Sequence, residues 1–131
     1  MYKWLLSVIC AAMFLCIACA PDPWVQVIGT LDEVETVMRV NVEDPDKLLS
    51  ELDRVIETSR PVLRDAHRRI INGSVSEGER KLNVNKQKFL DVVSRITDLD
   101  LEIQDRLKDD PKKLSAYIER VNQLGVLYNE Q

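Results

Sequence analysis

The chain has 131 residues and carries 18 basic against 22 acidic side chains, a formal net charge of −4. This length allows one small domain with a modest core, and the acidic excess argues against a nucleic-acid-binding protein, which would present a basic surface. All three cysteines lie within the first 20 residues, so the rest of the chain has none for a disulfide or a thiolate zinc site.

The N-terminal segment has the layout of an export signal. Lys3 precedes an uncharged apolar run from Trp4 to Ala20, which is followed by Pro21. A short positive region before an apolar stretch is typical of a secretory signal peptide. Because the run lies at the lower edge of the roughly 17 to 25 residues that span a bilayer, an uncleaved anchor is the alternative. Both interpretations export the chain.

The end of this segment, CIAC, resembles the lipobox of bacterial lipoproteins, in which a small residue precedes a cysteine that is lipidated and becomes the new N-terminus. Ala18 and Cys19 occupy those two positions, whereas the place that the family usually fills with Leu holds Cys16. The resemblance implies a signal peptide over residues 1–18 and a lipidated Cys19 at the start of a tether over residues 19–29. Cleavage after Ala-Cys-Ala by the ordinary signal peptidase is the alternative.

The resemblance also implies a location. In lipoproteins of this type, an Asp directly after the lipidated cysteine commonly retains the protein in the inner membrane, and this chain has Ala20 there. We therefore expect a lipid-anchored protein at the periplasmic face of the outer membrane, in contact with the membrane through its lipid.

In the exported part, the apolar residues recur at helical spacing. This pattern predicts an all-α fold, a small antiparallel bundle of about four helices over residues 30–131. The stretch TLDE offers a capping box, with Thr30 as N-cap and Glu33 as its partner. It predicts a first helix from Thr30 to near Val42, with the residues before it as a tether. The apolar face of this helix would hold Trp24, Ile28, Leu31, Val34 and Met38.

Two similar phrases, DPDKLLSELDRV from Asp44 and DPKKLSAYIERV from Asp110, predict the starts of the second and fourth helices. In each, Asp can cap the helix and Pro suits its first position. A regular apolar stripe favours a single second helix, kinked at Pro61 and ended by Asn72-Gly73, over two separate helices. The stripe comprises Leu48, Leu52, Val55, Val62, Ala66 and Ile70.

A second capping box, SEGE, predicts that the third helix starts after Ser76, with Glu79 as the partner. Its apolar stripe comprises Phe89, Val92, Ile96, Leu99, Ile103 and Leu107. The fourth helix would bury Leu114, Ile118, Val121 and Leu124, with Tyr128 as a further candidate.

The sequence contains no catalytic or cofactor signature, so we expect neither an enzyme nor a cofactor. His67 is the only histidine, and the exported part offers no second His or Cys to complete a metal site or a dyad with it. The glycines form neither a dinucleotide fingerprint nor a phosphate loop. Four carboxylates on one helical stripe lack the loop of an EF-hand and indicate a solvated face. They are Asp98, Glu102, Asp105 and Asp109.

Charge is distributed unevenly along the exported part. Residues 60–90 hold eight basic and three acidic side chains, a net +5, whereas residues 43–59 and 91–111 each carry a net −4. If the chain folds back near residues 72–76, the bundle has a basic end and an acidic end. The first helix would start at the basic end, which predicts that this end faces the membrane. The membrane-facing patch would comprise Arg60, Arg64, Arg68, Arg69, Arg80 and Lys81.

These features predict a membrane-tethered periplasmic lipoprotein that acts as a non-catalytic protein-binding or accessory factor, such as a pilot in cell-envelope assembly. The acidic stripe would face an envelope protein partner, and no nucleic acid is expected. The alternative is a structural, oligomeric coiled coil that links membrane and cell wall. A small-ligand carrier is a third class, which would require a cavity. The sequence leaves the oligomeric state open.

Overall fold

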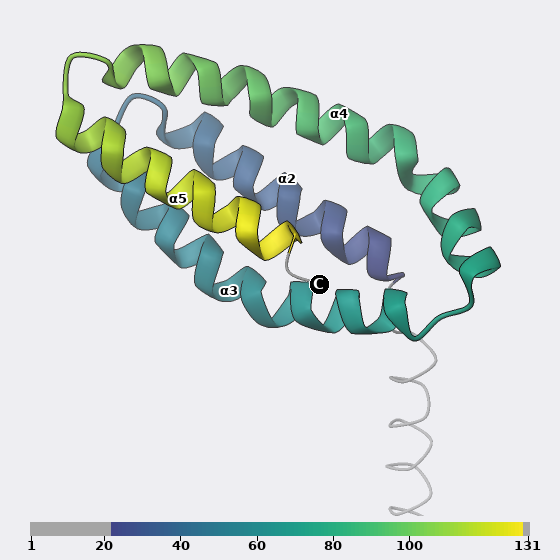
Figure 1. Ribbon diagram of the computed structural model, residues 1–131. Helices are drawn as coiled ribbons and strands as arrows, with labels where there is room; N and C mark the ends of the chain where they lie inside the picture. Colours follow the sequence, from purple (N-terminus) through teal and green to yellow (C-terminus); the bar gives the residue numbers. More distant parts are fainter. Residues whose placement is uncertain (1–21, 130–131) are drawn as a thin grey trace, which may run out of the picture.

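The computed structural model describes residues 22–129, and four α-helices account for nearly all of them (Figure 1). The helices are α2 (Pro23–Asn41), α3 (Pro45–Ile71), α4 (Val75–Leu107) and α5 (Pro111–Asn129). No residue from 22 to 129 belongs to a strand. The predicted small all-α bundle of four helices is therefore confirmed.

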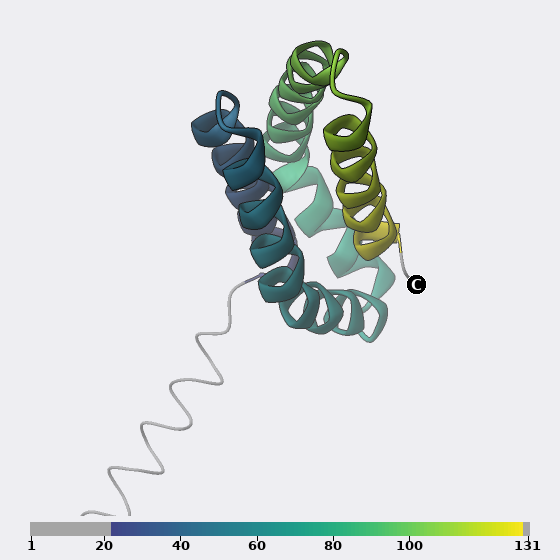
Figure 2. The ribbon, with the colours of Figure 1, turned by 90° about the vertical axis from the view of Figure 1, so that its left-hand side faces the viewer.

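Successive helices run antiparallel and are joined by short turns over residues 42–44, 72–74 and 108–110 (Figures 1 and 2). In space, α2 packs against α3 and α4, while α5 packs against α3 and less extensively against α4. The α2–α3 and α4–α5 hairpins are thus stacked so that α2 and α4 run in the same direction, as do α3 and α5. Each hairpin therefore consists of two antiparallel helices, and the two hairpins contact each other through parallel pairs, α2 with α4 and α3 with α5.

The two Asp-Pro helix starts are confirmed. Asp44 Oδ1 accepts a hydrogen bond from the Lys47 amide at 3.1 Å, and Asp110 Oδ1 accepts one from the Lys113 amide, also at 3.1 Å. Each bond satisfies an amide that has no partner within the helix. Both capping residues lie next to the turns that close the two hairpins.

Two other predicted helix starts are wrong. Helix α2 begins at Pro23 rather than Thr30, because Asp22 accepts a hydrogen bond from the Trp24 amide at 2.8 Å and acts as the N-cap. Residues 23–29, predicted as part of the tether, are therefore helical. The N-cap of α4 is Ser74 rather than Ser76, and its hydroxyl accepts from the Glu77 amide at 3.3 Å.

The core lies between the four helices and is densest around α2 and the first half of α3. Leu48, Leu52 and Val55 are almost completely buried, as the predicted stripe requires. The chain stays helical through Pro61, which confirms a single second helix, and Figure 2 shows α3 changing direction in its second half. Ala66 is fully buried as predicted, whereas Leu63 rather than Val62 is the buried residue of the turn before it, in line with Ile56 and Ser59.

The buried face of α5 also differs from the prediction. Tyr117 is fully buried, whereas Ile118, predicted to be in the core, is 39% exposed. Leu124 and Leu127 complete the buried face, and Leu114 and Val121 are half-buried beside it. In α4, only Val92, Ile103 and Leu107 of the predicted apolar stripe are buried.

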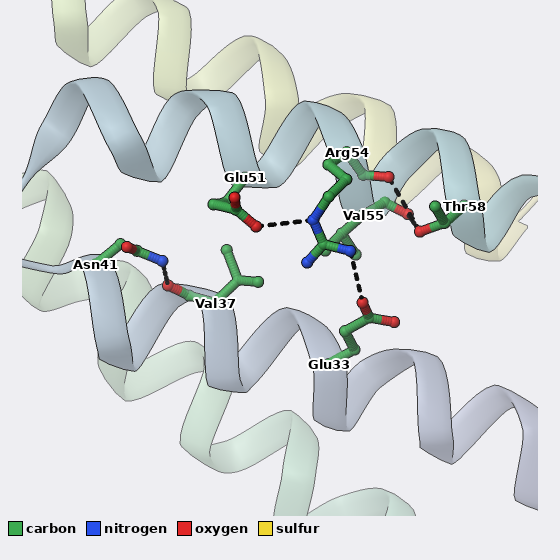
Figure 3. Close-up of polar contacts among 7 residues, drawn as sticks. All are labelled: Glu33, Val37, Asn41, Glu51, Arg54, Val55 and Thr58. Carbon is green, nitrogen blue, oxygen red and sulfur yellow. Dashed lines mark hydrogen bonds and ion pairs between the residues drawn. The ribbon is translucent and has the colours of Figure 1, made fainter.

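Ion pairs between helices lie in the half of the molecule that contains the α2–α3 and α4–α5 turns. Arg54 of α3 contacts both Glu51 of its own helix, at 2.8 Å, and Glu33 of α2, at 3.1 Å (Figure 3). These hydrogen bonds raise the pKa of Arg54 above its ordinary value. The other interhelical pairs among the described residues are Asp32–Arg95, Glu43–Arg106, Asp46–Lys113 and Asp53–Arg120.

The opposite half of the bundle is more open because the helices differ in length. Helix α4 has 33 residues and α5 has 19, so α5 ends level with the middle of α4. The end of α3 and the beginning of α4 therefore extend beyond α5, and α4 bows away from the other helices there (Figure 1). Among the described residues, the ion pairs of this half join residues of a single helix.

Candidate functional site

An apolar groove, which we call the side groove, lies between α4 and α5 with α2 as its floor. Its volume is about 360 Å³, within the range of about 300 to 1,000 Å³ typical of small-molecule pockets. Gly125 on α5 contributes no side chain, and a Cβ placed there would meet no atom within 4 Å. The lining includes Leu31, Met38, Phe89, Val93, Ile96 and Leu124.

A second cavity, which we call the end cavity, adjoins the side groove where α5 ends. Phe89 and Tyr128 line both spaces. The end cavity has a volume of about 500 Å³ and is lined by residues of all four helices, the others being Trp24, Val27, His67, Ile70, Ile71 and Asn129. Among the described residues, Trp24 Nε1 is buried without a hydrogen-bond partner.

A third, more polar hollow of about 390 Å³ adjoins the end cavity at His67 and Ile71. It lies on the second half of α3, against Leu127 of α5. We call its charged side chains, Arg60, Arg64 and Arg68, the arginine rim. The structure therefore places three of the predicted membrane-facing arginines beside apolar cavities, which the sequence analysis did not foresee.

Tyr117, which is fully buried, and Tyr128, which is half-buried, lie near the ends of the side groove. The Tyr128 hydroxyl is 2.7 Å from Thr30 Oγ1, and burial raises the pKa of Tyr128 to about 12. The Tyr117 hydroxyl donates to Asp100 Oδ1 at 2.7 Å, and burial together with this hydrogen bond raises the pKa of Tyr117 well above its ordinary value. Both side chains are therefore neutral at physiological pH, and they join α5 to α2 and to α4.

The predicted basic patch lies at the end of the bundle where α2 begins. Arg69 Nη1 donates to Gln26 Oε1 in the second turn of α2 at 3.1 Å. Four of the other patch residues pair with acids of their own helix: Arg60 with Glu57, Arg68 with Asp65, and Arg80 and Lys81 with Glu77.

These pairs leave part of the patch without a counter-charge. The hydrogen bond from Arg80 is the main reason why the pKa of Glu77 lies below its ordinary value. Arg64 and Arg69 form no ion pair with another residue between 22 and 129, and the same holds for the nearby Lys86 and Lys88. The basic end therefore keeps an excess of positive charge.

Three residues of the predicted acidic stripe lie on the side of α4 that faces away from the core, and the fourth, Asp109, lies in the turn that follows α4. All four of its carboxylates are exposed: Asp98, Glu102, Asp105 and Asp109. Glu102 pairs with Arg106 at 2.9 Å and Asp105 with Lys108 at 3.0 Å, whereas Asp98 and Asp109 have no ion pair with a described residue. No group of side chains in the described part of the chain has the composition of a metal site.

The predicted lipidation site, Cys19, lies outside the described residues, as do the predicted signal peptide over 1–18 and the first residues of the predicted tether. None of the helices from α2 to α5 contains an apolar stretch long enough to cross a bilayer. No family model matches the chain, and neither a curated protein nor a solved structure gives a match.

Proposed function

We propose that this protein is a membrane-tethered periplasmic lipoprotein that acts as a non-catalytic accessory or pilot factor and binds a protein of the cell envelope. The observation that carries the proposal is the position of α2 relative to the charged ends of the bundle. Helix α2 begins at Pro23, four residues after Cys19, and its first turns lie beside Arg69 at the basic end. A lipid on Cys19 would hold this end next to the bilayer.

The charge of the basic end suits that orientation. An anionic head group attracts each nearby Lys or Arg by about 1 kcal/mol, and the attraction fades within a Debye length. The side chains that lack an ion pair among the described residues, such as Arg64 and Lys86, are the most available for this contact.

The acidic stripe supports the second half of the proposal. It lies on the solvent side of α4 and of the turn that follows this helix, where Asp98 and Asp109 have no ion pair with any residue from 22 to 129. A partner with a basic surface would be attracted to it, because charge complementarity accelerates association and selects among partners.

The coiled-coil alternative is less well supported. An oligomeric coiled coil would need continuous apolar seams on α3 and α4 that face other chains. The best-formed stretch of such a seam, Leu48 to Val55 of α3, is buried inside the bundle of a single chain, as is Ile103 of α4. We therefore favour the accessory factor.

Binding to vesicles tests the membrane half. All core residues lie between Val27 and Leu127, so a chain beginning at Asp22 keeps the whole core. It should float with anionic vesicles at low salt, but not at high salt and not with zwitterionic vesicles. Replacing Arg64, Arg68 and Arg69 by Gln should abolish flotation. The matched control replaces three exposed lysines of the other end by Gln, Lys47, Lys108 and Lys112. Equal losses in both variants would contradict the proposed orientation.

Cross-linking in cells tests the partner half. A photoreactive residue at position 102 or 109 of the full chain should yield the same cross-linked product, because both positions lie on the acidic stripe. The control position is Thr36, which is exposed on α2. No product from the stripe, or the same product from Thr36, would contradict a partner site on α4.

A further inference from the structure

We propose that the end cavity and the side groove bind the hydrocarbon tail of a long-chain fatty acid, and that the arginine rim binds its carboxylate. This inference is independent of the protein partner and of the lipid on Cys19. It assigns the molecule a ligand of stated chemistry, an anionic single-chain amphiphile, at the end of the bundle where α2 begins.

The shape of the site suits a single tail. The side groove and the end cavity adjoin at Phe89 and Tyr128, and together they extend from the middle of α4 to the end of α3. Most of the side chains that line this path are aliphatic or aromatic, so a tail would contact mainly apolar surface. The polar ones are Thr97 and Asp100 in the side groove and His67 and Asn129 in the end cavity. Burying methylene groups is favourable by about 0.8 kcal/mol each.

The charge of the site suits an anionic head group. The arginine rim adjoins the end cavity at His67 and Ile71, so a carboxylate on the rim would be continuous with a tail in the cavity. Arg64 has no ion pair with a described residue, whereas Arg60 and Arg68 each face one acid of their own helix, Glu57 and Asp65. Arginine binds carboxylates through two parallel hydrogen bonds, which favours this head group over a neutral one.

The architecture explains why these cavities exist. Helix α5 ends at Asn129, level with the middle of α4, and no ion pair among the described residues ties α3 to α4 in the half beyond it. The apolar side chains of this region lack a fourth helix to cover them. Ile71, which lines the end cavity, is 68% exposed. A bound tail would cover part of this apolar surface.

Photolabelling tests the location of the tail. We would use the full chain in nanodiscs of zwitterionic lipid, with a diazirine-bearing palmitate as the probe, and identify the labelled peptides by mass spectrometry. Labels should fall on residues 89–96 of α4 and 121–128 of α5. Unlabelled palmitate should compete at least tenfold better than hexadecanol. Labelling confined to other segments would overturn the proposal. Protein cross-links that join these positions to a second copy of the chain, or to residues 1–21 of the same chain, would also overturn the proposal.

Two glycine variants provide a matched pair for the groove. Gly125→Leu places a side chain in the open space of the side groove, and should reduce labelling at least tenfold. Gly29→Leu makes the same change on exposed α2 surface, where a Cβ also meets no atom within 4 Å, and should leave labelling unchanged. Circular dichroism would confirm equal helicity. Equal labelling of the two variants would overturn the proposal.

Arginine variants test the head group separately. Arg64→Gln combined with Arg68→Gln should reduce competition by palmitate about tenfold, while competition by hexadecanol stays the same. An equal effect on both competitors would show that the rim does not bind the carboxylate. Because Gly125 lines the side groove and not the hollow of the arginine rim, Gly125→Leu should still float with anionic vesicles, which separates this inference from the proposed membrane contact.

Discussion

The hydroxyl groups of Thr30 and Tyr128 lie 2.7 Å apart and join the first and last described helices, although 98 positions separate them in the chain. Thr30 Oγ1 is also 2.8 Å from the Val27 carbonyl oxygen, to which it donates its only hydroxyl proton. Tyr128 is therefore the donor in the bond to Thr30. This bond fixes the end of α5 on α2 at the place where the side groove meets the end cavity.

The Thr30–Tyr128 bond should stabilise the fold measurably. Tyr128→Phe and Thr30→Val should each lower the free energy of unfolding by about 1 kcal/mol, the usual contribution of such a bond. The double variant should lose less than the sum of the two, because the second change removes a bond that is already broken. Urea unfolding of the parent chain, the two single variants and the double variant measures this coupling. Strictly additive losses would contradict the hydrogen bond.

Stability should decrease at high pH because of Tyr117 and Tyr128. A tyrosine whose folded-state pKa is raised keeps its proton in the native state at a pH where the unfolded chain, with a pKa near 10, has lost it. The unfolded state then binds fewer protons, so stability falls as pH rises above about 10. For Tyr128, whose folded-state pKa is about 12, the loss is complete above that pH and amounts to about 2 to 3 kcal/mol.

Phenylalanine variants would show whether Tyr117 and Tyr128 cause this loss of stability. Urea unfolding between pH 9 and 11 should show a weaker pH dependence for Tyr117→Phe and for Tyr128→Phe than for the parent chain, because each variant lacks one buried hydroxyl that ionises on unfolding. The same slope in all three proteins would mean that lysines, rather than these tyrosines, cause the alkaline loss.

The three Asp-Pro helix starts should contribute similarly to stability. Asp22→Ala, Asp44→Ala and Asp110→Ala each remove a side chain that accepts a hydrogen bond from an amide in the first turn. Each should lower the free energy of unfolding by about 1 kcal/mol, as typical N-caps do. Thermal unfolding measures the loss, and an unchanged midpoint for Asp22→Ala would contradict a helix that begins at Pro23.

Ser74 and Ser76 offer a matched test of the α4 start. Ser74→Ala removes the cap and should cost about 1 kcal/mol, whereas Ser76→Ala, in the first turn, should change stability by a few tenths at most because Ala favours the helix. Both residues are exposed, so packing losses are small. A larger loss for Ser76→Ala would restore the start predicted from the sequence.

Lipidation remains a prediction from the sequence. Replacing Cys19 by Ser should abolish incorporation of labelled palmitate into the full chain in cells, because only the thiol provides the attachment atom. Replacing Cys16 by Ser is the matched control and should leave incorporation unchanged. An unmodified N-terminus at Pro21 in the mature protein would contradict the lipoprotein proposal.

Local signals in the sequence predicted much of the fold. Asp44 and Asp110 were found because Asp before Pro favours one conformation regardless of what packs on the helix. The same signal is present at Asp22-Pro23, although the capping box at Thr30 predicts a later start. Since Thr30 donates to Val27 within α2, its hydroxyl has a role in the middle of the helix rather than at its start.

Features that depend on tertiary packing could not be predicted in this way. Val62 and Leu63 both fit a helical stripe, and which of them is buried depends on the side of α3 that α2 and α5 cover, the side that also holds Ile56 and Ser59. Tyr117 is buried and donates a hydrogen bond to Asp100 of α4, a contact that depends on the register of the α4–α5 hairpin. The charged end was recognised from the sequence, but its cavities depend on how far α5 reaches along α4.

The start of α2 at Pro23 limits how far a lipid-anchored bundle could move from the bilayer. Even a fully extended chain spans at most about 14 Å from Cys19 to Pro23, at roughly 3.5 Å per residue. The longest helix, α4, has 33 residues and is about 50 Å long at a rise of 1.5 Å per residue. Its far end would thus stay within about 65 Å of the membrane surface. An anchored molecule would search only this layer, so its partner must present its binding surface there.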